Sequence, residues 1–434
     1  MPIARAASRA AVRLGAVVLS GALLVACGSG SSGGTSDSAG GKVTLTVDLF
    51  GSFGYQEAGL YAEYQKLHPD ITIKQSDTQE EPDYWKSLQT RLAGGGGLAD
   101  VQGVEVGRIA SVTQQQSDKF EDLKQYGADT LKDQFAEAKW SAATTQDGRI
   151  LGLGTDVGPE AMCYRTDLFK KAGLPTDRAE LAQKWSTWEG YLDLGREYMA
   201  KAPAKSAWLD SVGSLYSIMI GQEKERYYDA SGKLVYEQNP AVKTAWDTSV
   251  EAAGAGLSAK LDQWSPQWNQ AFAAGSFATI PCPAWMLSYI KGQAGDAGSG
   301  KWDIAKLPGG AGNWGGSYLS VPRAAEHKKE AYELIKWLTA PEQQAKLFRD
   351  QGLFPSSTGA IAQVADAKDP YFSDAPIGQI FGDAAKAAPV QVLGVHDANV
   401  AQQITNALSG VERKGTPSAK AWSTVKKGVD NVIG

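Results

Sequence analysis

Glu105 and Asp156 are two carboxylates whose places in the sequence could bring them to one cleft. Carboxylates are planar hydrogen-bond acceptors and can bind the hydroxyl groups of a sugar. Two carboxyl groups about 5–5.5 or 6.5–9.5 Å apart can instead hydrolyse a glycosidic bond. The sequence has no Gly-x-Ser-x-Gly, phosphate-binding loop or His-Glu-x-x-His motif. The residue types alone leave a binding site and a hydrolytic site open.

The 13 tryptophans are the second feature that could do chemistry, because aromatic faces pack against the C–H faces of sugar rings. Trp285 is the strongest candidate, since it follows a strand-like segment and lies on a loop after Pro283. The apolar patterns around Trp188, Trp302 and Trp337 indicate structural roles for these three side chains.

Alternating strand and helix patterns must position these residues. The sequence predicts strands over 42–50, 71–77 and 99–106, with helices between them. This rhythm is typical of a parallel or mostly parallel sheet covered by helices. Such sheets bind ligands outside the carboxyl ends of their strands, where the loops 51–55 and 105–108 are expected.

The later part of the chain continues the α/β pattern. A strand is predicted near 162–164, and a helix, strand, turn and helix over 268–290. Two helices are predicted over 330–357, separated at Pro341, and a helical tail over 400–433.

The first 41 residues have the composition of a leader and a tether. Residues 1–26 combine basic residues with a short apolar run that ends in small residues, as in a secretory signal peptide. The sequence Leu-Val-Ala-Cys, which ends at Cys27, resembles the lipobox of bacterial lipoproteins, where the cysteine becomes the lipid-bearing N-terminus. An ordinary cleaved signal is the alternative. Residues 28–41 are rich in Gly and Ser and are expected to form a flexible tether.

The composition of the remaining chain bounds its partners. About 390 residues are enough for two lobes. A net charge of −5 argues against a nucleic-acid partner, which would favour a basic face. No later segment has the 18 uninterrupted apolar residues of a membrane-spanning helix.

Cys163 and Cys282 are expected to form a disulfide, because a secreted chain folds in an oxidising compartment and both residues lie on strand-like segments. Two buried thiols are the alternative. The cysteines and the three histidines lack metal-ligand spacing, which argues against zinc. Neither a metal nor another cofactor is expected.

These segments resemble the family-one extracellular solute-binding proteins of ABC importers, the class that includes maltose-binding protein. The resemblance covers the whole mature chain and rests on several motifs, which are the Ala-Asp-Val strand at 99–101, GRILGLGTD with CYRTDLFKKAGLP (148–175), the Phe-x-x-Gly motif at 272–279 with Pro283–Trp285, the loop 315–317 and LIKWLTAPEQQ (334–344). Within that family, FGSFGY, GLGTDVGPEAMCYRTDLF and the Cys282–Trp285 turn look like the cellobiose and cello-oligosaccharide-binding lipoproteins.

The resemblance implies a two-lobed α/β fold of the maltose-binding-protein type that binds its ligand in the interlobe cleft. One lobe would comprise residues 42–154 plus 318–355, and the other 155–317 plus 356–434. Hinge crossings are expected near Thr155, Ser317 and Pro355. The partners would be the oligosaccharide, permease subunits and a cytoplasmic ATPase. The protein would be a monomer, lipid-anchored on the extracellular face of the membrane.

The resemblance also implies the site residues. Trp285 falls at or within two residues of the family's stacking tryptophan. Glu105 and Arg108 lie in the region of a family Asp-Arg pair, although Gly107 occupies one polar family position. The further candidates are aromatic, acidic or hydroxyl side chains in segments near the expected cleft: Ser52, Phe53, Tyr55, Asp156, Trp208, Asp210, Trp264, Ser317 and His396.

Three alternatives remain beside cello-oligosaccharides. Xylo- and other β-linked oligosaccharides present similar equatorial hydroxyls and flat apolar faces. A binder of peptides or metal chelates would call for a charged cleft rather than an aromatic one. A secreted glycoside hydrolase is the remote alternative, because the resemblance to binding proteins accounts for the whole chain.

Overall fold

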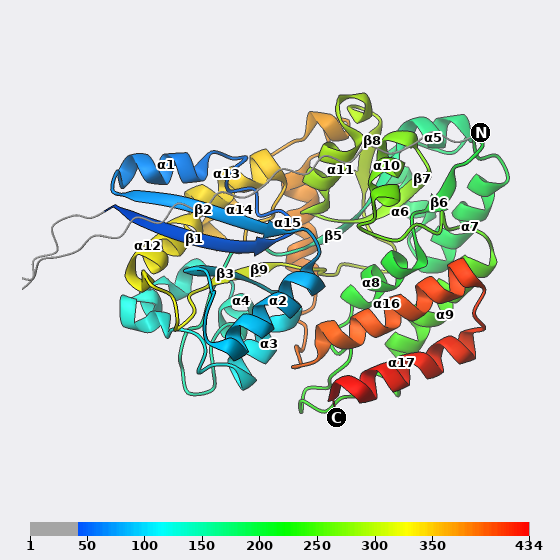
Figure 1. Ribbon diagram of the computed structural model, residues 1–434. Helices are drawn as coiled ribbons and strands as arrows, with labels where there is room; N and C mark the ends of the chain where they lie inside the picture. The colour runs from blue at the N-terminus through cyan, green and yellow to red at the C-terminus, as the bar shows by residue number, and fades with distance from the viewer. Residues whose placement is uncertain (1–41, 434) are drawn as a thin grey trace, which may run out of the picture. The chain divides into compact units, whose positions relative to one another are not determined.

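The first of two β-sheets begins with the N-terminal β–α alternation and is completed by strands from later in the chain (Figure 1). The computed structural model describes residues 42–433. The strand order is β2-β1-β3-β9-β4. The strands are β1 (Val43–Phe50), β2 (Ile71–Thr78), β3 (Val101–Glu105), β4 (Leu153–Gly154) and β9 (Ser317–Ser320).

This first sheet is mixed rather than mostly parallel. Strand β1 pairs in parallel with β2 and β3, as the β–α alternation predicts. Strand β9 enters between β3 and β4 and runs antiparallel to both. On β1, Leu45, Val47 and Leu49 point into the core, and their spacing of two matches the strand period.

The second sheet has the order β6-β7-β5-β8. Strand β5 is antiparallel to β7 and β8, whereas β6 and β7 are parallel. Every residue of β5 and β7 is buried, in keeping with the mostly apolar sequence of β7 and the apolar centre of β5. The strands are β5 (Glu160–Arg165), β6 (Ala207–Leu209), β7 (Phe277–Pro283) and β8 (Trp302–Ala305).

Helices cover the two sheets, and we call the parts of the chain around the first and second sheets lobe 1 and lobe 2. Up to the end of β7 the helices are α1 (Leu60–Leu67), α2 (Glu81–Gly94), α3 (Val106–Gln115), α4 (Glu137–Ala142), α5 (Thr166–Lys171), α6 (Arg178–Lys184), α7 (Trp188–Met199), α8 (Val212–Gly221), α9 (Pro240–Gly254) and α10 (Pro266–Ala274). After β7 they are α11 (Met286–Ala294), α12 (Lys328–Leu338), α13 (Pro341–Gln351), α14 (Thr358–Gln363), α15 (Ile377–Ala387), α16 (Asp397–Lys414) and α17 (Ser418–Ile433). Short 3-10 helices lie at Leu123–Tyr126, Ala128–Gln134, Asp296–Gly298 and Pro370–Phe372.

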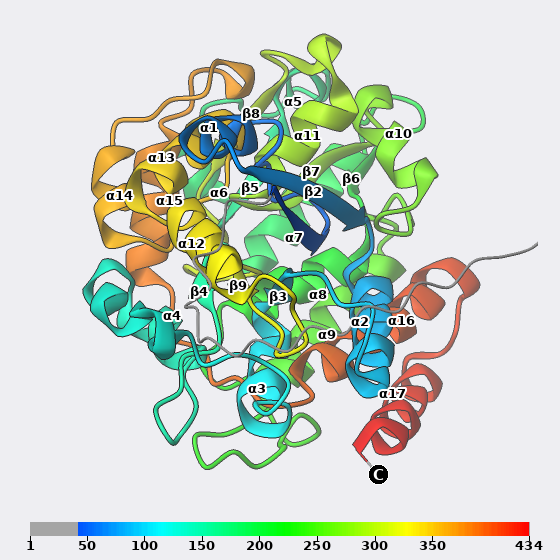
Figure 2. The same cartoon turned by 60° about the vertical axis from the view of Figure 1, so that its left-hand side comes forward.

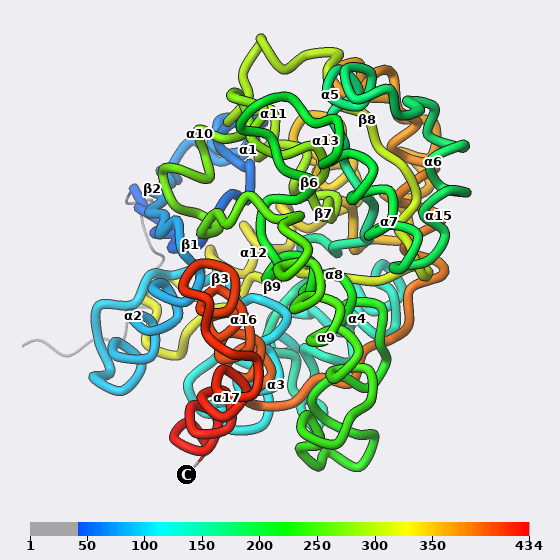
Figure 3. Tube along the Cα trace, turned by 90° about the vertical axis from the view of Figure 1, so that its right-hand side faces the viewer, coloured from blue at the N-terminus to red at the C-terminus, as the bar shows by residue number. Residues whose placement is uncertain are grey.

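The late helices pack on segments far from them in sequence. Helix α12 lies beside α1, where the rings of Tyr64 and Trp337 are 5.3 Å apart (Figure 2). Helices α16 and α17 run side by side at one side of lobe 2 (Figure 3). The predicted helical tail is therefore two helices, because Gly415 ends α16 in the left-handed conformation with a φ of 64°.

Three chain segments pass between the sheets next to one another. The Thr155 N–H donates to the Ser317 carbonyl at 2.9 Å, and the Val157 N–H donates to the Phe354 carbonyl at 2.9 Å. Asp156 and Pro355 form an isolated antiparallel bridge. Adjacent crossing strands of this kind can bend together, so we propose that these crossings are the hinges and that the lobe boundaries are those expected from the sequence.

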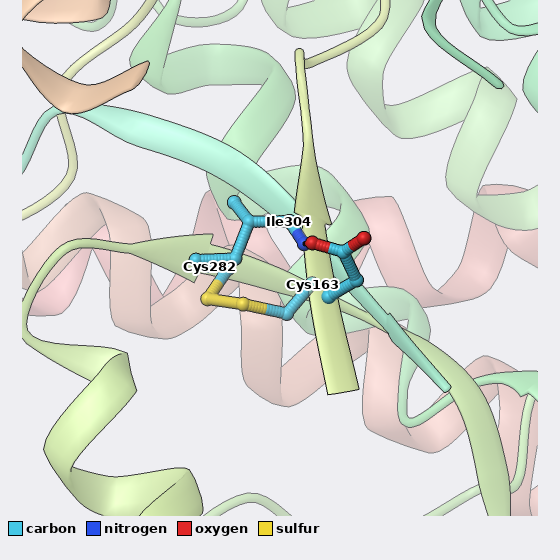
Figure 4. The surroundings of a disulfide bond; sticks show 4 residues. Cys163, Cys282 and Ile304 are labelled. Carbon is cyan, nitrogen blue, oxygen red and sulfur yellow. Dashed lines mark hydrogen bonds between the residues drawn. A yellow bond between two sulfur atoms is a disulfide. The ribbon is translucent and has the colours of Figure 1, made fainter. Parts of the chain in front are cut away.

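The structure contains the predicted disulfide between Cys163 and Cys282. It joins the neighbouring strands β5 and β7, with the two Cα atoms 5.4 Å apart (Figure 4). Both cysteines are fully buried, and both lie in lobe 2. The signal peptide over residues 1–26, Cys27 and the tether lie outside the described residues.

Candidate functional site

A cleft with a volume of about 540 Å³ lies between the two lobes and is lined by residues from both. Its lobe 1 side comes from the loops after β1, β2 and β3, at the carboxyl ends of these parallel strands, as expected for such a sheet. Its lobe 2 side comes from α8, the loop before α10, the start of α11 and one face of α16. The predicted site residues that line it are Ser52, Phe53, Tyr55, Glu105, Arg108, Asp156, Trp264, Trp285 and Ser317.

Four aromatic side chains form one wall of the cleft, and we call them the aromatic wall: Trp264, Trp285, Tyr289 and Trp314. The rings of Trp264 and Trp285 are 6.0 Å apart with planes at 31°, and Trp314 meets Trp285 edge-on at 5.7 Å. The indole N–H of Trp285 donates to the Trp314 carbonyl at 2.8 Å, which fixes the orientation of its ring. All four are partly exposed, so they present aromatic faces to a ligand.

The loop after β1 contributes a second aromatic group. Phe53 and Tyr55 line the cleft but are 6% and 1% exposed. Phe53 packs edge-on against Phe50 with ring centroids 5.2 Å apart. Most of the surface of these two side chains is therefore in the lobe 1 core, whereas Ser52 is exposed.

Glu105 is the last residue of β3 and the N-cap of α3. Its carboxylate accepts the N–H of Gly107 at 2.5 Å, which satisfies one of the free amides of the first helical turn. Burial, with a smaller contribution from the nearby Glu81, raises the pKa of Glu105 to about 7. At neutral pH this carboxyl can therefore either accept or donate a hydrogen bond to a hydroxyl group.

Arg108 makes its hydrogen bonds within the protein. Its guanidinium donates to both carboxylate oxygens of Glu81 at 3.0 and 3.2 Å, lies 5.2 Å from the Trp85 ring centroid, and donates across the cleft to Asn399 on α16. These bonds use three of its five N–H groups, and the one to Asn399 links the two lobes.

Asp156 lies where the chain first crosses between the sheets. Its carboxylate accepts the Thr155 hydroxyl at 2.7 Å. Burial raises its pKa, opposed by the nearby Lys139 ammonium. Lys139 is itself buried at 3.9 Å from the Tyr318 ring centroid, and burial lowers its pKa to about 8. The Asp156 carboxyl at the first crossing thus lies near the Lys139 amine on α4.

Helix α16 presents a polar stripe to the cleft. Gln402, Thr405 and Ser409 recur at helical spacing on the face that lines it. At the start of the helix, Asp397 accepts a hydrogen bond from the guanidinium of Arg226 at 2.5 Å, so this buried pair is mutually neutralised. The stripe supplies neutral hydrogen-bonding groups of the kind that sugar hydroxyls require.

Three predicted contacts are not among the residues that line the cleft. Trp208 is fully buried on β6 and packs against Tyr191 and Phe169 at 5.1 and 5.4 Å, so it is a core residue. Asp210 is fully buried and accepts hydrogen bonds inside lobe 2. His396 precedes Asp397 at the start of α16, and it is Asp397 that borders the cleft.

The sequence reasoning missed several residues that do line the cleft. Tyr289 stands one helical turn after Trp285, so the i, i+4 spacing on α11 could have indicated it. Trp314 directly precedes two glycines, a signal of a turn near a site. The stripe on α16 is a polar face that the sequence equally allows on a solvated surface, so no signal distinguished it.

Within residues 42–433, no group of three or more His, Cys, Asp or Glu side chains could hold a metal ion. In the same part of the chain, none of the helices combines the length and the apolar character needed to cross a membrane.

Most of the chain is similar to known proteins of one family. Residues 59–375 match the family model described as bacterial extracellular solute-binding protein. The lactose-binding protein of Rhizobium radiobacter is 27% identical over 379 residues, which cover 82% of this chain and 84% of that protein. The arabinooligosaccharide-binding protein of Bacillus subtilis (strain 168) is 26% identical over 342 residues, or 75% of this chain and 74% of that protein. A crystal structure of a family 1 extracellular solute-binding protein is 43% identical, with a TM-score of 0.76, and the match covers 90% of this chain and all of that one.

Proposed function

Because the chain belongs to the bacterial extracellular solute-binding proteins, we propose that it captures an oligosaccharide for an ABC importer. The observation that carries this proposal is the aromatic wall, which lines one cleft together with carboxyl, hydroxyl and amide groups. A sugar presents C–H faces to aromatic rings and hydroxyl edges to polar groups, so both of its surfaces find partners. The names of the lactose- and arabinooligosaccharide-binding relatives support a sugar ligand.

We propose cellobiose or a cello-oligosaccharide as the ligand. β-Linked glucose chains are flat, with apolar faces that suit the neighbouring Trp264 and Trp285 rings, whose planes differ by 31°. The proposed contacts are the cleft residues Trp285, Trp264, Glu105, Asp156, Phe53, Tyr55, Ser52 and Ser317. A xylo- or other β-linked oligosaccharide is the alternative ligand, because these sugars share the flat shape.

Calorimetric titration against a sugar panel tests the proposal. The panel contains cellobiose, cellotriose, xylobiose, xylotriose, lactose and arabinotriose, with maltose as an α-linked control. The expected result is saturable one-to-one binding that is tightest for a cello-oligosaccharide. Tightest binding of a xylo-oligosaccharide would replace the ligand but keep the function, and no binding of any sugar would refute the function.

The same samples separate binding from hydrolysis. Glu105 and Asp156 both line the cleft, as a pair of hydrolytic carboxylates would. A binding protein returns cellotriose uncut after prolonged incubation, as judged by chromatography of the sugar. Appearance of cellobiose and glucose, abolished by Glu105→Gln, would support the glycoside hydrolase alternative.

We further propose that the protein is a monomer anchored outside the cell by lipid on Cys27, from where it delivers sugar to permease subunits driven by a cytoplasmic ATPase. Cys27 is the residue of the lipobox-like sequence. The Cys27→Ala variant should be released into the medium or remain unprocessed. A variant that stays membrane-bound with the wild-type mass would contradict the lipid anchor.

A further inference from the structure

The loop that carries Trp264 has an unusual backbone. It runs from Ser258 to Trp264 between α9 and α10, and two of its non-glycine residues, Lys260 and Trp264, have φ angles of 57° and 70°. L-residues with side chains avoid this left-handed region, so such conformations persist only where the surroundings hold them. Trp264 belongs to the aromatic wall, so the strain lies at the proposed site.

Asp210 is hydrogen-bonded to the second half of this loop. Its backbone carbonyl accepts the Leu261 N–H at 3.2 Å. Its carboxylate accepts the indole N–H of Trp268 at 2.8 Å and the side-chain amide of Gln263 at 3.4 Å. The Ser214 hydroxyl donates to the other carboxylate oxygen at 2.5 Å. One buried side chain thus connects the strained loop, the helix after it and α8.

Glu412 on α16 holds the first half of the loop. One of its carboxylate oxygens accepts the Ser258 hydroxyl at 2.6 Å and the Val212 N–H at 3.1 Å. The Ser258 hydroxyl oxygen in turn accepts the N–H of Lys260, the first strained residue, at 2.9 Å. Glu412 therefore fixes the loop through one hydroxyl group.

The held loop places Trp264 against three aromatic neighbours. Its ring lies 5.0 Å from Trp268, 5.3 Å from Tyr289 and 6.0 Å from Trp285. Trp268 is fully buried, so Trp264 packs against a side chain of the lobe 2 core. Through the hydrogen bond to Trp268, Asp210 acts on the position of Trp264 without lining the cleft itself.

We propose that Asp210 and Glu412 are positioning residues that preset Trp264 as part of the aromatic wall before ligand arrives. Buried carboxylates are costly, and here both are used to satisfy one loop and its supporting helix. A preset stacking surface improves affinity because the loop loses no conformational freedom on binding. This inference rests on the proposed oligosaccharide function, because presetting matters only if a ring stacks on Trp264.

The test uses the full chain, with its tryptophans replaced by 5-fluorotryptophan and observed by fluorine NMR without ligand. The Trp264 resonance is assigned as the one lost in Trp264→Phe. Asp210→Ala should shift this resonance or broaden it, and should weaken cellotriose binding tenfold or more. Asp210→Asn keeps an acceptor for Trp268, so it should restore the resonance and bring the affinity to within about threefold of wild type.

Asp303 provides the matched control. It is also buried in lobe 2 and accepts hydrogen bonds from Arg178 at 2.7 Å and Tyr164 at 3.0 Å, but it does not contact the loop. Asp303→Ala should lower stability while leaving the Trp264 resonance and the cellotriose affinity within twofold of wild type. Equal effects of Asp303→Ala and Asp210→Ala on Trp264 would overturn the proposal.

A milder variant keeps the test decisive if Asp210→Ala does not fold. Ser258→Ala removes only the hydroxyl between Glu412 and the loop, and should also broaden the Trp264 resonance. An unchanged resonance in a folded Asp210→Ala or Ser258→Ala protein would overturn the positioning role whatever the ligand. A moved resonance in a protein that binds no sugar would keep the positioning role and refute the proposed function instead.

Discussion

At the scale of single residues, the contrast between Trp285 and Trp208 decides where the binding energy lies. Trp285 is partly exposed in the cleft, so Trp285→Ala should weaken oligosaccharide binding by about 2 kcal/mol or more, roughly thirtyfold. The thermal stability of the ligand-free variant should change much less, because a side chain in the cleft has little core packing to lose. Calorimetry and thermal unfolding on the same sample measure both quantities.

Trp208 is the matched comparison, because its side chain is fully buried among aromatic neighbours. Trp208→Ala should cost about 3–5 kcal/mol of unfolding free energy, as truncation of a core aromatic does. If Trp285→Ala instead lost this much stability and kept normal affinity, Trp285 would be a core residue and the aromatic wall would not be the site.

A second prediction at the residue scale concerns pH. Burial raises the pKa of Glu412 to about 7, opposed mainly by the hydrogen bonds that its carboxylate accepts from Ser258 and Val212. Between about pH 4.5 and 7 the folded protein therefore binds more protons at this group than the unfolded chain, so stability falls as pH rises through this window. Denaturant unfolding at pH 5 and pH 8 measures the difference in unfolding free energy between the two pH values. Glu412→Gln should reduce this difference by roughly 1–3 kcal/mol. An unchanged slope would mean that Glu412 does not titrate in this window.

At the scale of elements, the disulfide ties the two central strands of the lobe 2 sheet. Cys163 and Cys282 are 119 residues apart, and closing so long a loop contributes roughly 4–5 kcal/mol in the chain-entropy model, and less in practice. The double variant Cys163→Ala/Cys282→Ala should unfold at clearly lower denaturant concentration than the oxidised wild type. Reduced wild type is the control, and an equal midpoint for the oxidised and reduced proteins would contradict a stabilising bond.

The elements were largely predictable from sequence, and their tertiary environment was not. Strands β1 and β2 and helices α12 and α13 follow from local periodicity and from Pro341, which starts a helix. The antiparallel insertion of β9 between β3 and β4 depends on a return of the chain from lobe 2, which no local pattern encodes.

The same limit explains the outcome for the site residues. Trp208 is the middle residue of the short strand β6 and Trp285 follows the end of β7, and both come directly after an alanine. The packing of aromatic side chains that include Phe169 and Tyr191 buries Trp208 in the lobe 2 core, away from the cleft. Burial of this kind depends on how the elements pack together. The local sequence therefore indicated both tryptophans as candidates and could not show which one lines the cleft.

At the scale of the described molecule, the three adjacent crossings near Thr155, Ser317 and Pro355 are suited to a hinge. Ligand should bring the lobes together, because aromatic rings from lobe 2 and the Glu105 carboxyl from lobe 1 must meet the same sugar. Small-angle X-ray scattering should show a smaller radius of gyration with saturating cellotriose than without it. Maltose at the same concentration is the control, and an unchanged radius at saturation would argue against closure.

The position of β9 inside the first sheet has a consequence for biosynthesis. A growing chain emerges from its N-terminus, yet β3 cannot gain its second neighbour until Ser317–Ser320 has been made. Until then the edge of β3 is an unpaired template for association with other chains. A chain truncated before Ser317 should therefore aggregate when it leaves the ribosome. The growing chain therefore exposes this edge until nearly three quarters of it has been synthesised.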